Sequence, residues 1–150
     1  MFQDFRSTNG LYSRTYEHRG TSLDGRTLFD MSTLENINKV AMLNMVLTEI
    51  RIKCRNAPTT GFHHLVSVLH RRGRLQRCYT QNFDGLQTRD YPELTAMVYE
   101  LHGSNQRVRC QLCRAVCNLP LASLDNEFLR TGLVHCLVCE ARGESYLASV

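Results

Sequence analysis

The sequence has no apolar run approaching the roughly 20 residues that a membrane-spanning helix needs. Residues 1–6 also lack the basic and then apolar order of a secretory signal peptide. We therefore expect no membrane segment, and thiols that stay reduced. Internal repeats and low-complexity segments are absent too. With 43% hydrophobic residues, a chain of 150 residues is long enough to form one domain with a buried core.

Acidic residues are missing from one long stretch of the chain. Between Arg51 and Phe83 there is no Asp or Glu, although the net charge of the whole chain is only +4. A stretch with basic and no acidic residues usually forms a solvent-exposed surface. A surface that binds nucleic acid or another acidic partner is the less favoured interpretation. The basic residues of the stretch are Arg51, Lys53, Arg55, Arg71, Arg72, Arg74 and Arg77.

The seven cysteines cannot all pair with one another, because their number is odd. Four of them form two C-x-x-C pairs, Cys110 with Cys113 and Cys136 with Cys139, and residues 114–135 lie between the pairs. Two residues between thiolates allow both sulfurs to reach one Zn²⁺ ion at about 2.3 Å. The spacing therefore predicts one zinc site with four thiolate ligands. Because four thiolates leave no position for water, we expect this zinc to hold structure and not to catalyse.

The other three cysteines have different surroundings in the sequence. Cys117 lies four residues after Cys113 and could compete with it as a ligand, although the symmetric set of two C-x-x-C pairs is favoured. Cys54 and Cys78 lie in apolar or strand-like contexts. We expect both of them to be thiols of the core.

The pattern of apolar residues predicts two helices in the first half of the chain. Residues 1–30 show no clear period and predict an irregular, loop-rich region. A capping box at 32–35, followed by apolar residues every three or four positions, predicts a helix over 33–54 with one face in the core. A second helix begins near Phe62 and ends before Gly73.

A strand, a polar loop and another strand are expected next. Residues 75–80 predict a strand, and 81–85 are polar and typical of a turn. Residues 91–103 predict a short helix that leads into a strand ending near Leu101. A helix, a strand and a polar loop in this order form an α/β unit. Since ligands of open α/β sheets bind at the carboxyl ends of strands, the loop after Thr80 is a candidate site.

Four segments carry, in order along the chain, a resemblance to a known family. The segments are Asp4-Phe5-Arg6-Ser7, Thr80-Gln81-Asn82-Phe83-Asp84, Leu101-His102-Gly103, and the two C-x-x-C pairs. With them the chain resembles the sirtuins, the NAD-dependent protein lysine deacylases, over about residues 2–147. Phe83 stands where the family has Ile in its Thr-Gln-Asn-Ile-Asp signature.

The resemblance implies roles for the residues of the two loops. His102 would act as the general base on the nicotinamide ribose hydroxyls of NAD, a task that suits imidazole because it changes protonation near neutral pH. Asn82 and Asp84 would hydrogen-bond the nicotinamide carboxamide, and Gln81 would hold the ribose. The implied reaction transfers an acetyl group from a protein lysine to the ADP-ribose of NAD and releases nicotinamide.

The resemblance also implies the remaining cofactor and metal contacts. Asp4, Phe5 and Arg6 would belong to the cofactor site, where Phe5 would shield the reactive sugar carbon and Arg6 would help to order NAD. The two C-x-x-C pairs fall where the family has its zinc module. The implied cofactors are therefore NAD and zinc, with zinc on Cys110, Cys113, Cys136 and Cys139.

The fold implied by the resemblance is α/β: a partial Rossmann-like parallel sheet with an inserted small zinc-ribbon module that has four cysteine ligands. Residues 1–106 would form the partial Rossmann-like and helical part, 107–142 the zinc-binding module, and 143–150 the start of the return to the Rossmann part. The family's Gly-Ala-Gly-Ile-Ser loop would precede Asp4, and its closing strands would follow. We therefore expect the middle of a sirtuin catalytic domain, truncated at both ends.

The expected partners are an acetylated protein, with histones as the candidate, and NAD as co-substrate. The expected location is the nucleus, with the cytoplasm as the alternative. A glycine-rich loop presents backbone N–H groups to a diphosphate, and side chains do not readily replace it. The sequence therefore leaves a second hypothesis, a catalytically inactive zinc-binding fragment that serves as a protein or nucleic-acid interaction module. A third is a fragment without function.

Overall fold

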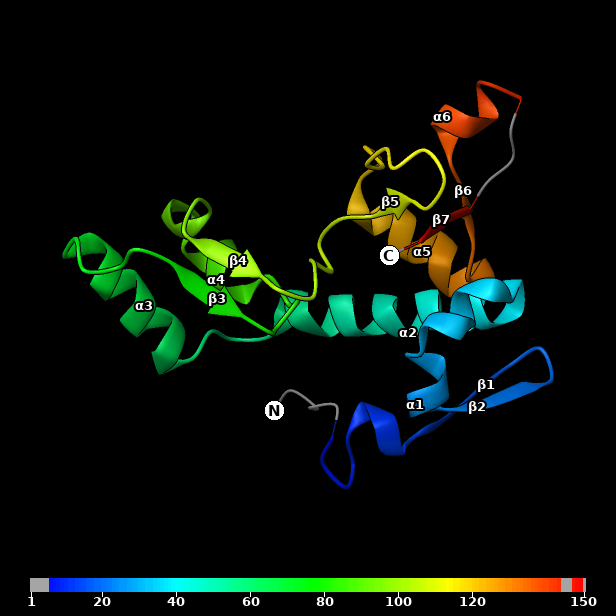
Figure 1. Cartoon of the computed structure of the whole chain (residues 1–150), viewed down its shortest axis with the longest axis horizontal. Helices are drawn as coiled ribbons and strands as arrows, with labels where there is room; N and C mark the ends of the chain where they lie inside the picture. The colour runs from blue at the N-terminus through cyan, green and yellow to red at the C-terminus, as the bar shows by residue number, and fades with distance from the viewer. Residues whose placement is uncertain (1–5, 144–146, 150) are drawn as a thin grey trace. The chain divides into compact units, whose positions relative to one another are not determined.

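The computed structural model describes residues 6–143 and 147–149, and the chain in it divides into two compact units (Figure 1). The first unit holds residues 1–48 and 108–150, and the second holds residues 49–107. The long helix α2 (Ile37–Asn56) contributes to both. None of the helices in the described ranges combines the length and apolar character needed to span a bilayer. The division at residue 107 predicted from the sequence remains a prediction.

The first unit begins with an ordered hairpin. Strands β1 (Thr15–His18) and β2 (Thr21–Asp24) pair antiparallel, and the short helix α1 (Gly25–Leu28) follows a 3₁₀ turn and the hairpin. Arg19 and Gly20 have φ values of 48° and 77°, which a tight two-residue hairpin turn requires. The prediction of an irregular region over 1–30 was therefore wrong for this part. Strands of four residues are too short to show a clear alternating pattern in the sequence.

Helix α2 begins later than the sequence predicted. Residues Met31–Glu35 form a separate 3₁₀ helix, η2, and α2 starts at Ile37. The side chain of Asn36 accepts the N–H of Asn38 at 3.0 Å and of Lys39 at 3.3 Å. The predicted capping box at 32–35 was wrong, because asparagine is an equally good N-cap and is the one used.

Polar as well as apolar side chains of α2 are buried. Of the predicted core stripe, Val40 and Cys54 are buried, but Ile37 is 55% exposed. Asn44 donates from Nδ2 to the carbonyl oxygen of Gly132 at 2.9 Å, within the first unit. Arg51 donates to the carbonyl oxygen of Asn105 at 3.3 Å, within the second. The helix is therefore held partly by hydrogen bonds to loop carbonyls.

One hydrophobic cluster of the first unit lies around helix α5 (Leu121–Thr131). Leu124 and Phe128 of α5 pack with Val108 and Val134. Gly132 ends α5 with a φ of 73°. The remaining elements of this unit are β5 (Arg109–Cys110), β6 (Val134–His135), α6 (Leu137–Glu140) and β7 (Leu147–Ser149). The three strands form an antiparallel sheet in the order β5-β7-β6.

The second unit is a small α/β arrangement. Strands β3 (Cys78–Thr80) and β4 (Val98–Glu100) pair in parallel. Helix α3 (Gly61–Arg71) precedes β3, and α4 (Leu86–Asp90) and the 3₁₀ helix η3 (Pro92–Leu94) lie between the strands in sequence. Both strands and the helix before β3 were predicted. The α/β class with a parallel sheet is confirmed, whereas strands beyond this pair remain a prediction.

Side-chain hydrogen bonds join the elements of the second unit. Gln87 of α4 donates from Nε2 to the carbonyl oxygen of His63 in α3 at 3.1 Å. Ser67 of α3 donates to the Glu93 carboxylate at 3.2 Å. Both Ser67 and Gln87 are buried. These contacts fix α3 against α4 and η3, the segment that connects β3 with β4.

Candidate functional site

The loops after β3 and β4 leave the same edge of the parallel sheet. Thr80 pairs with Glu100 in the register, and the N–H of Leu101 donates to the Thr80 carbonyl oxygen at 2.9 Å. Gln81, Asn82 and Asp84 follow β3, and His102 follows β4. Parallel pairing therefore brings these predicted site residues to one edge of one sheet.

The loop after β3 is shaped by its own side chains. Thr80 Oγ1 accepts the N–H of Asn82 at 3.0 Å, and Asp84 Oδ1 accepts the N–H of Leu86 at 3.1 Å. Gly85 has a φ of 71°, and a Cβ there would lie 2.7 Å from the side chain of Gln106. The result is a compact turn in which Gln81 and Asn82 are exposed and Asp84 is half-buried.

Hydrogen bonds tie this loop to the segment after β4. The N–H of Asn105 donates to the Phe83 carbonyl oxygen at 2.9 Å, and Gln106 Nε2 donates to the Asp84 carbonyl oxygen at 3.2 Å. His102 is exposed, and in the sequence it lies between the end of β4 and Asn105, the first residue of these contacts. The two loops are therefore one connected structure.

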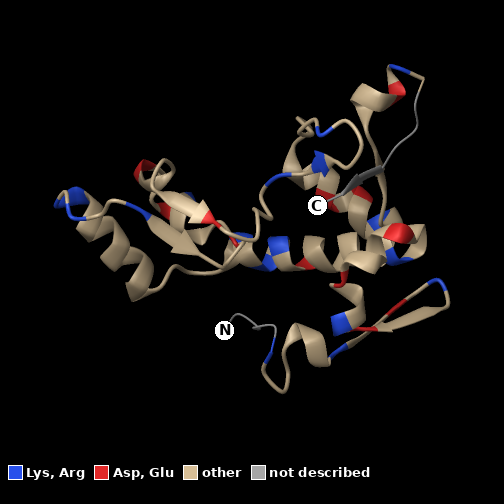
Figure 2. Cartoon of the chain, viewed as in Figure 1, with Lys and Arg blue, Asp and Glu red and all other residues tan. Residues whose placement is uncertain are grey.

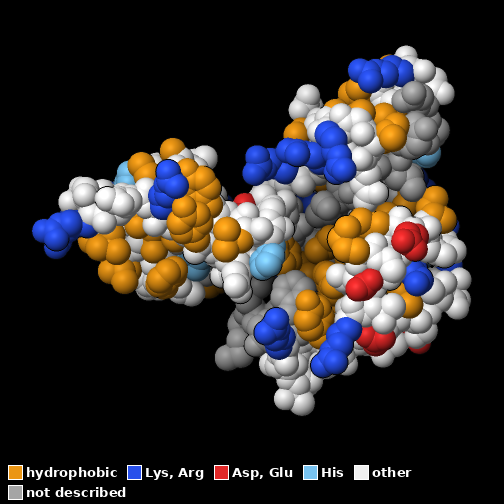
Figure 3. All heavy atoms as spheres, in the orientation of Figure 1, with side chains coloured by type: hydrophobic (Ala, Val, Ile, Leu, Met, Phe, Trp, Pro, Cys, Tyr) orange, Lys and Arg blue, Asp and Glu red, His pale blue; other side chains and the backbone are white. Residues whose placement is uncertain are grey.

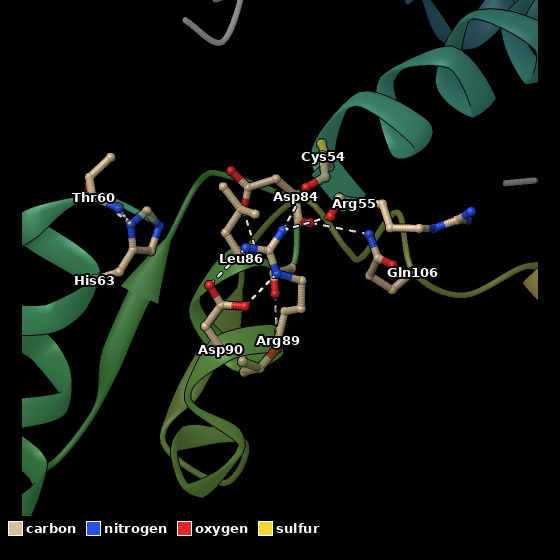
Figure 4. A network of polar contacts seen from close by, with 11 residues as sticks. Cys54, Arg55, Thr60, His63, Asp84, Leu86, Arg89, Asp90 and Gln106 are labelled. Atoms are coloured by element: carbon tan, nitrogen blue, oxygen red, sulfur yellow. Dashed lines mark hydrogen bonds and ion pairs between the residues drawn. The ribbon is translucent and has the colours of Figure 1, made fainter. Parts of the chain in front are cut away.

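Arg89 of α4 fastens the carboxyl end of α2 beside this edge (Figure 4). Its Nη1 donates to the carbonyl oxygens of Cys54 at 2.9 Å and Arg55 at 3.1 Å. The Cys54 carbonyl has no helical partner four residues on, because Pro58 has no N–H. Sequence reasoning missed this contact, since no periodicity or spacing marks Arg89.

Asp90 completes the arrangement around the Arg89 guanidinium. Its carboxylate oxygens accept from Arg89 Nε at 2.6 Å and from Nη2 at 2.8 Å. The hydrogen bonds from Arg89 hold the pKa of the Asp90 carboxyl below its usual value. The same pairing with Asp90 raises the pKa of Arg89. This planar, two-bond contact orients the guanidinium toward the end of α2.

Cys54 lies fully buried next to this network. Burial, and to a smaller degree the negative charge of Asp84, raises the pKa of the Cys54 thiol to about 12. The thiol is therefore neutral at physiological pH and is not a nucleophile. The predicted core position of Cys54 is confirmed, whereas Cys78 is only half-buried, with a pKa raised by burial.

Arg6 lies in the first unit. With Ser7, Tyr12, Ser13 and Arg26 it lines a cavity of about 310 Å³. The two arginines make this cavity suited to an anionic group. Asp4 and Phe5, the other predicted cofactor residues of this segment, lie outside the described residues.

The four cysteines of the two C-x-x-C pairs come together in the first unit. Their Sγ atoms all lie within 4.8 Å of one another. Cys110 and Cys139 are 3.7 Å apart, and Cys113 and Cys136 are 3.6 Å apart, measured between Sγ atoms. Four sulfurs at 2.3 Å from a central ion would be separated by about 3.8 Å in a tetrahedron. The four-cysteine cluster therefore fits a zinc ion with a closed shell.

Short turns hold each cysteine pair. The N–H of Cys110 donates to the Ala115 carbonyl oxygen at 2.9 Å, and the N–H of Arg114 donates to the Cys110 carbonyl oxygen at 3.1 Å. Cys136 precedes α6, and its carbonyl oxygen accepts the N–H of Glu140 at 2.9 Å. Backbone hydrogen bonds within each turn therefore position the two cysteines of each pair.

Cys117 is not part of the four-cysteine cluster. Its N–H donates to the Val108 carbonyl oxygen at 2.8 Å, and its side chain packs against the core that contains Leu124 and Phe128. The structure therefore brings the two symmetric pairs together without Cys117, and the four cysteines as the zinc ligands remain a prediction.

The protonation of the cluster is uneven. Burial acts to raise the pKa of Cys110, but hydrogen bonds from the backbone of Cys113 and Leu112 outweigh it and bring that pKa to about 7. Burial and hydrogen bonds with the neighbouring thiols raise the pKa of Cys139 to about 12. A metal ion that binds all four sulfurs must therefore displace protons.

Comparison with known proteins identifies the family. The family model described as "Sir2 family" matches residues 2–144. The chain belongs to the Sir2 family. The residues of this match include both loops at the strand ends and all four cysteines of the cluster.

Relatives within the Sir2 family are similar over most of this chain. The NAD-dependent protein deacetylase hst4 of Schizosaccharomyces pombe is 28% identical, over 94% of this chain and 35% of its own length. The NAD-dependent histone deacetylase HST3 of Saccharomyces cerevisiae is 30% identical, over 92% of this chain and 35% of its own length. The hst4 protein of Emericella nidulans is matched over only 20% of its length. The chain thus spans about a third or less of these relatives.

A solved structure shows the same fold. It is described as "The Structural basis of Sirtuin Substrate Affinity", and it matches with a TM-score of 0.71 and 21% sequence identity. The match covers 97% of this chain and 51% of the solved chain. The α/β architecture with a four-cysteine module is therefore that of the Sir2 family.

Proposed function

We propose that this chain is part of the catalytic domain of an NAD-dependent protein lysine deacetylase. One observation carries the proposal: parallel pairing of β3 and β4 brings Gln81, Asn82, Asp84 and His102 to one edge of one sheet. The chain belongs to the Sir2 family, and relatives similar over more than nine tenths of it are named as NAD-dependent deacetylases.

We propose that the loop after β3 binds the nicotinamide and its ribose. An amide and a carboxylate together can accept from and donate to a carboxamide, and Asn82 and Asp84 supply these groups. The bond from the Leu86 N–H fixes the orientation of the Asp84 carboxylate. Gln81, exposed at the start of the same loop, would hold ribose hydroxyls.

We propose His102 as the general base. When bound, NAD would supply the ribose carbon at which nicotinamide is exchanged for the acetyl-lysine oxygen. His102 would take the proton of a ribose hydroxyl at its imidazole, a step for which imidazole is suited near neutral pH. Arg6, and Asp4 and Phe5 outside the described residues, would complete the cofactor contacts.

The four-cysteine cluster would contribute structure to this activity. Zinc on Cys110, Cys113, Cys136 and Cys139 would have a closed shell without a position for water or substrate. We therefore propose that zinc keeps the cluster and its surrounding turns folded and takes no part in the chemistry.

The substrate we propose is an acetylated lysine of a histone, and the location is the nucleus. The support is that relatives of this chain in Saccharomyces cerevisiae are named as histone deacetylases. A cytoplasmic protein substrate is the alternative.

Deacetylation of an acetylated histone peptide by the zinc-loaded chain tests the proposal. We expect NAD-dependent loss of the acetyl group, followed by mass spectrometry, and a rate at least about 100-fold lower in His102→Ala because the general base is removed. The control His70→Ala changes a histidine at the end of α3 and should leave the rate unchanged.

A binding experiment separates weak catalysis from a wrong assignment. Titration of the chain with NAD and with nicotinamide, followed by NMR, should shift the amide signals of the 81–85 loop, and Asn82→Ala should weaken this binding. Absence of both deacetylation and binding would favour an inactive zinc-binding module instead.

A further inference from the structure

A histidine holds the start of helix α3. The backbone N–H of Thr60, the residue before α3, donates to Nδ1 of His63 at 3.0 Å, and the Thr60 hydroxyl lies 2.9 Å from the same nitrogen (Figure 4). Capping boxes usually have glutamate or glutamine at this position, and neither side chain changes charge near neutral pH. The start of α3 therefore depends on a side chain that does.

The hydrogen bond defines the protonation of His63. A backbone N–H can only donate, so Nδ1 must offer its lone pair, and the ring proton must lie on Nε2. A second proton would have to bind Nδ1, where it would face the Thr60 N–H. The Thr60 hydroxyl could still accept from that proton, but the N–H would lose its acceptor. The cap is therefore complete only while His63 is neutral.

Charges on two helices act on a proton gained by His63. Arg71 is the only Lys, Arg, Asp or Glu in α3, so the first turn has no acidic side chain to offset a positive one (Figure 2). The positive end of the helix dipole disfavours the proton as well. From α4, the Asp90 carboxylate attracts it, and hydrogen bonds from Arg89 hold the pKa of that carboxyl below its usual value. Further titratable groups on α3 and on the segment beside it are His64, His70, Tyr91 and Glu93.

The first turn of α3 also contacts the helix that follows the loop after β3. The His63 carbonyl oxygen accepts from Nε2 of Gln87 at 3.1 Å, and Gln87 is buried. Gln87 lies in α4, which begins at Leu86, and Asp84 accepts the N–H of Leu86 at 3.1 Å. Two consecutive hydrogen bonds therefore connect the first turn of α3 with the side chain of Asp84.

We propose that His63 is a pH switch that controls the order of the loop after β3. When neutral, it caps α3, and the bond from Gln87 holds α4 in place. When protonated, it releases the Thr60 N–H and is held by the Asp90 carboxylate instead, and the first turn of α3 loosens together with its contact to α4. The loop is therefore most ordered above the pH range in which imidazole titrates, and its order falls as the pH falls through that range. The switch is independent of the deacetylase proposal, whereas its effect on nicotinamide binding rests on that proposal.

NMR of the full zinc-loaded chain without ligand tests the switch directly. Side-chain nitrogen shifts at about pH 8 should show His63 as the tautomer with its proton on Nε2. On titration to about pH 5.5, the Thr60 amide and the Gln87 side-chain amide should shift together with the ring signals of His63. Protection of the His64 and Leu86 amides from hydrogen exchange should fall together, by about fivefold at His64, the size expected for loss of a cap.

Glutamine variants assign the effect to one histidine. They are needed because several histidines lie on the second unit, as the pale blue side chains in Figure 3 show. His63→Gln keeps an acceptor for the Thr60 N–H but gains no proton, so the pH response should disappear and the protection should remain. His64→Gln is the matched control, since His64 lies in the same turn and contacts Tyr91 instead of Thr60, and it should respond like the parent chain. His102 is present in both variants, so its own titration cancels from the comparison.

Nicotinamide titrations followed by NMR separate the switch from the proposed function. Between about pH 7.5 and about pH 6, the parent chain should lose about twofold to fivefold more affinity than His63→Gln. If nicotinamide binds at neither pH while Gln87 and Leu86 still respond to His63, the deacetylase proposal fails and the switch stands.

Three results would overturn the switch. The first is a proton on Nδ1 of His63 at about pH 8, a measurement on the parent chain that needs no variant. The second is an unchanged pH response of Gln87 and Leu86 in folded His63→Gln. The third is nicotinamide affinity with the same pH dependence in the parent chain and in His63→Gln, which would mean that the loop is not under the control of His63.

Discussion

Gly132 meets two separate demands at the end of α5. Its φ of 73° lies in the left-handed region that disfavours a side chain. A Cβ here would also lie 2.5 Å from the Cβ and 2.7 Å from the Cα of Ala41 in α2. The Gly132 carbonyl in turn accepts the hydrogen bond from Asn44. The contact between α5 and α2 in the first unit therefore depends on the absence of a side chain.

We expect Gly132→Ala to lower the free energy of unfolding by about 3 kcal/mol or more, since it combines backbone strain with a clash against α2. Urea denaturation of the zinc-loaded chain, followed by circular dichroism, measures the change. Gly20→Ala is the matched control, because its φ is 77° but no atom lies within 4 Å of an added Cβ. It should cost only about 1 kcal/mol, and equal losses would contradict the close approach to Ala41.

At the scale of elements, the end of α2 depends on a side chain from another helix. The last carbonyls of a helix need partners from elsewhere, and Pro58 removes one that the chain itself would have offered. The N–H of Ala57 donates to the Cys54 carbonyl oxygen at 3.2 Å, and Arg89 of α4 adds donors to the carbonyl oxygens of both Cys54 and Arg55. Since α4 directly follows Asp84 and Gly85, this contact also anchors the loop after β3.

We expect Arg89→Met to lower the free energy of unfolding by about 1–2 kcal/mol, because charge-assisted hydrogen bonds to the end of α2 are lost. Amide hydrogen exchange should become faster at the end of α2 and in the 81–86 segment, but not in α5. Arg130→Met is the control, since Arg130 pairs with Glu127 on the exposed side of α5. Such a surface pair contributes less than about 1 kcal/mol. Unchanged exchange near α2 in Arg89→Met would contradict the anchoring role.

The sequence predicted those elements whose signal is local. The cysteine spacing predicted the four-cysteine cluster, and β3, β4 and the polar loop were found from turn residues and apolar runs. The β1–β2 hairpin was missed because its strands are four residues long, and the start of α2 was misplaced because Asn36 competes with Ser32 as a cap. Arg89 was missed for a different reason: its partners are backbone carbonyls 34 and 35 residues away. No pattern in one sequence reports such a contact.

At the scale of the whole molecule, the metal should decide whether the part of the first unit around the two cysteine pairs is folded. The hydrophobic cluster of Val108, Leu124, Phe128 and Val134 is small, and it lies on the chain between and beside the two cysteine pairs. Small domains that cannot bury a large core commonly depend on a structural metal.

We expect one bound zinc ion per chain, and loss of helical signal and cooperative unfolding when a chelator removes it. Acidification should weaken metal binding, because the thiols must be deprotonated to bind and protons compete more strongly as the pH falls.

Substitution of cobalt for zinc identifies the ligands, since thiolate-to-metal absorption bands report the four sulfurs. Cys136→Ser should lose these bands, whereas Cys117→Ser should keep them. Equal loss in both variants would contradict the assignment of ligands.

The separation of the cluster cysteines along the chain has a consequence for the unfolded state. Cys110 and Cys139 are 29 residues apart in sequence, and all of α5 lies between them. A metal ion that joined these positions before folding would act as a cross-link and remove about 3–4 kcal/mol of chain entropy from the unfolded ensemble. The chain between Cys110 and Cys139 would then form α5 and its contacts from the smaller set of conformations that a closed loop allows. The order in which metal and helix form would therefore set the folding rate of the first unit.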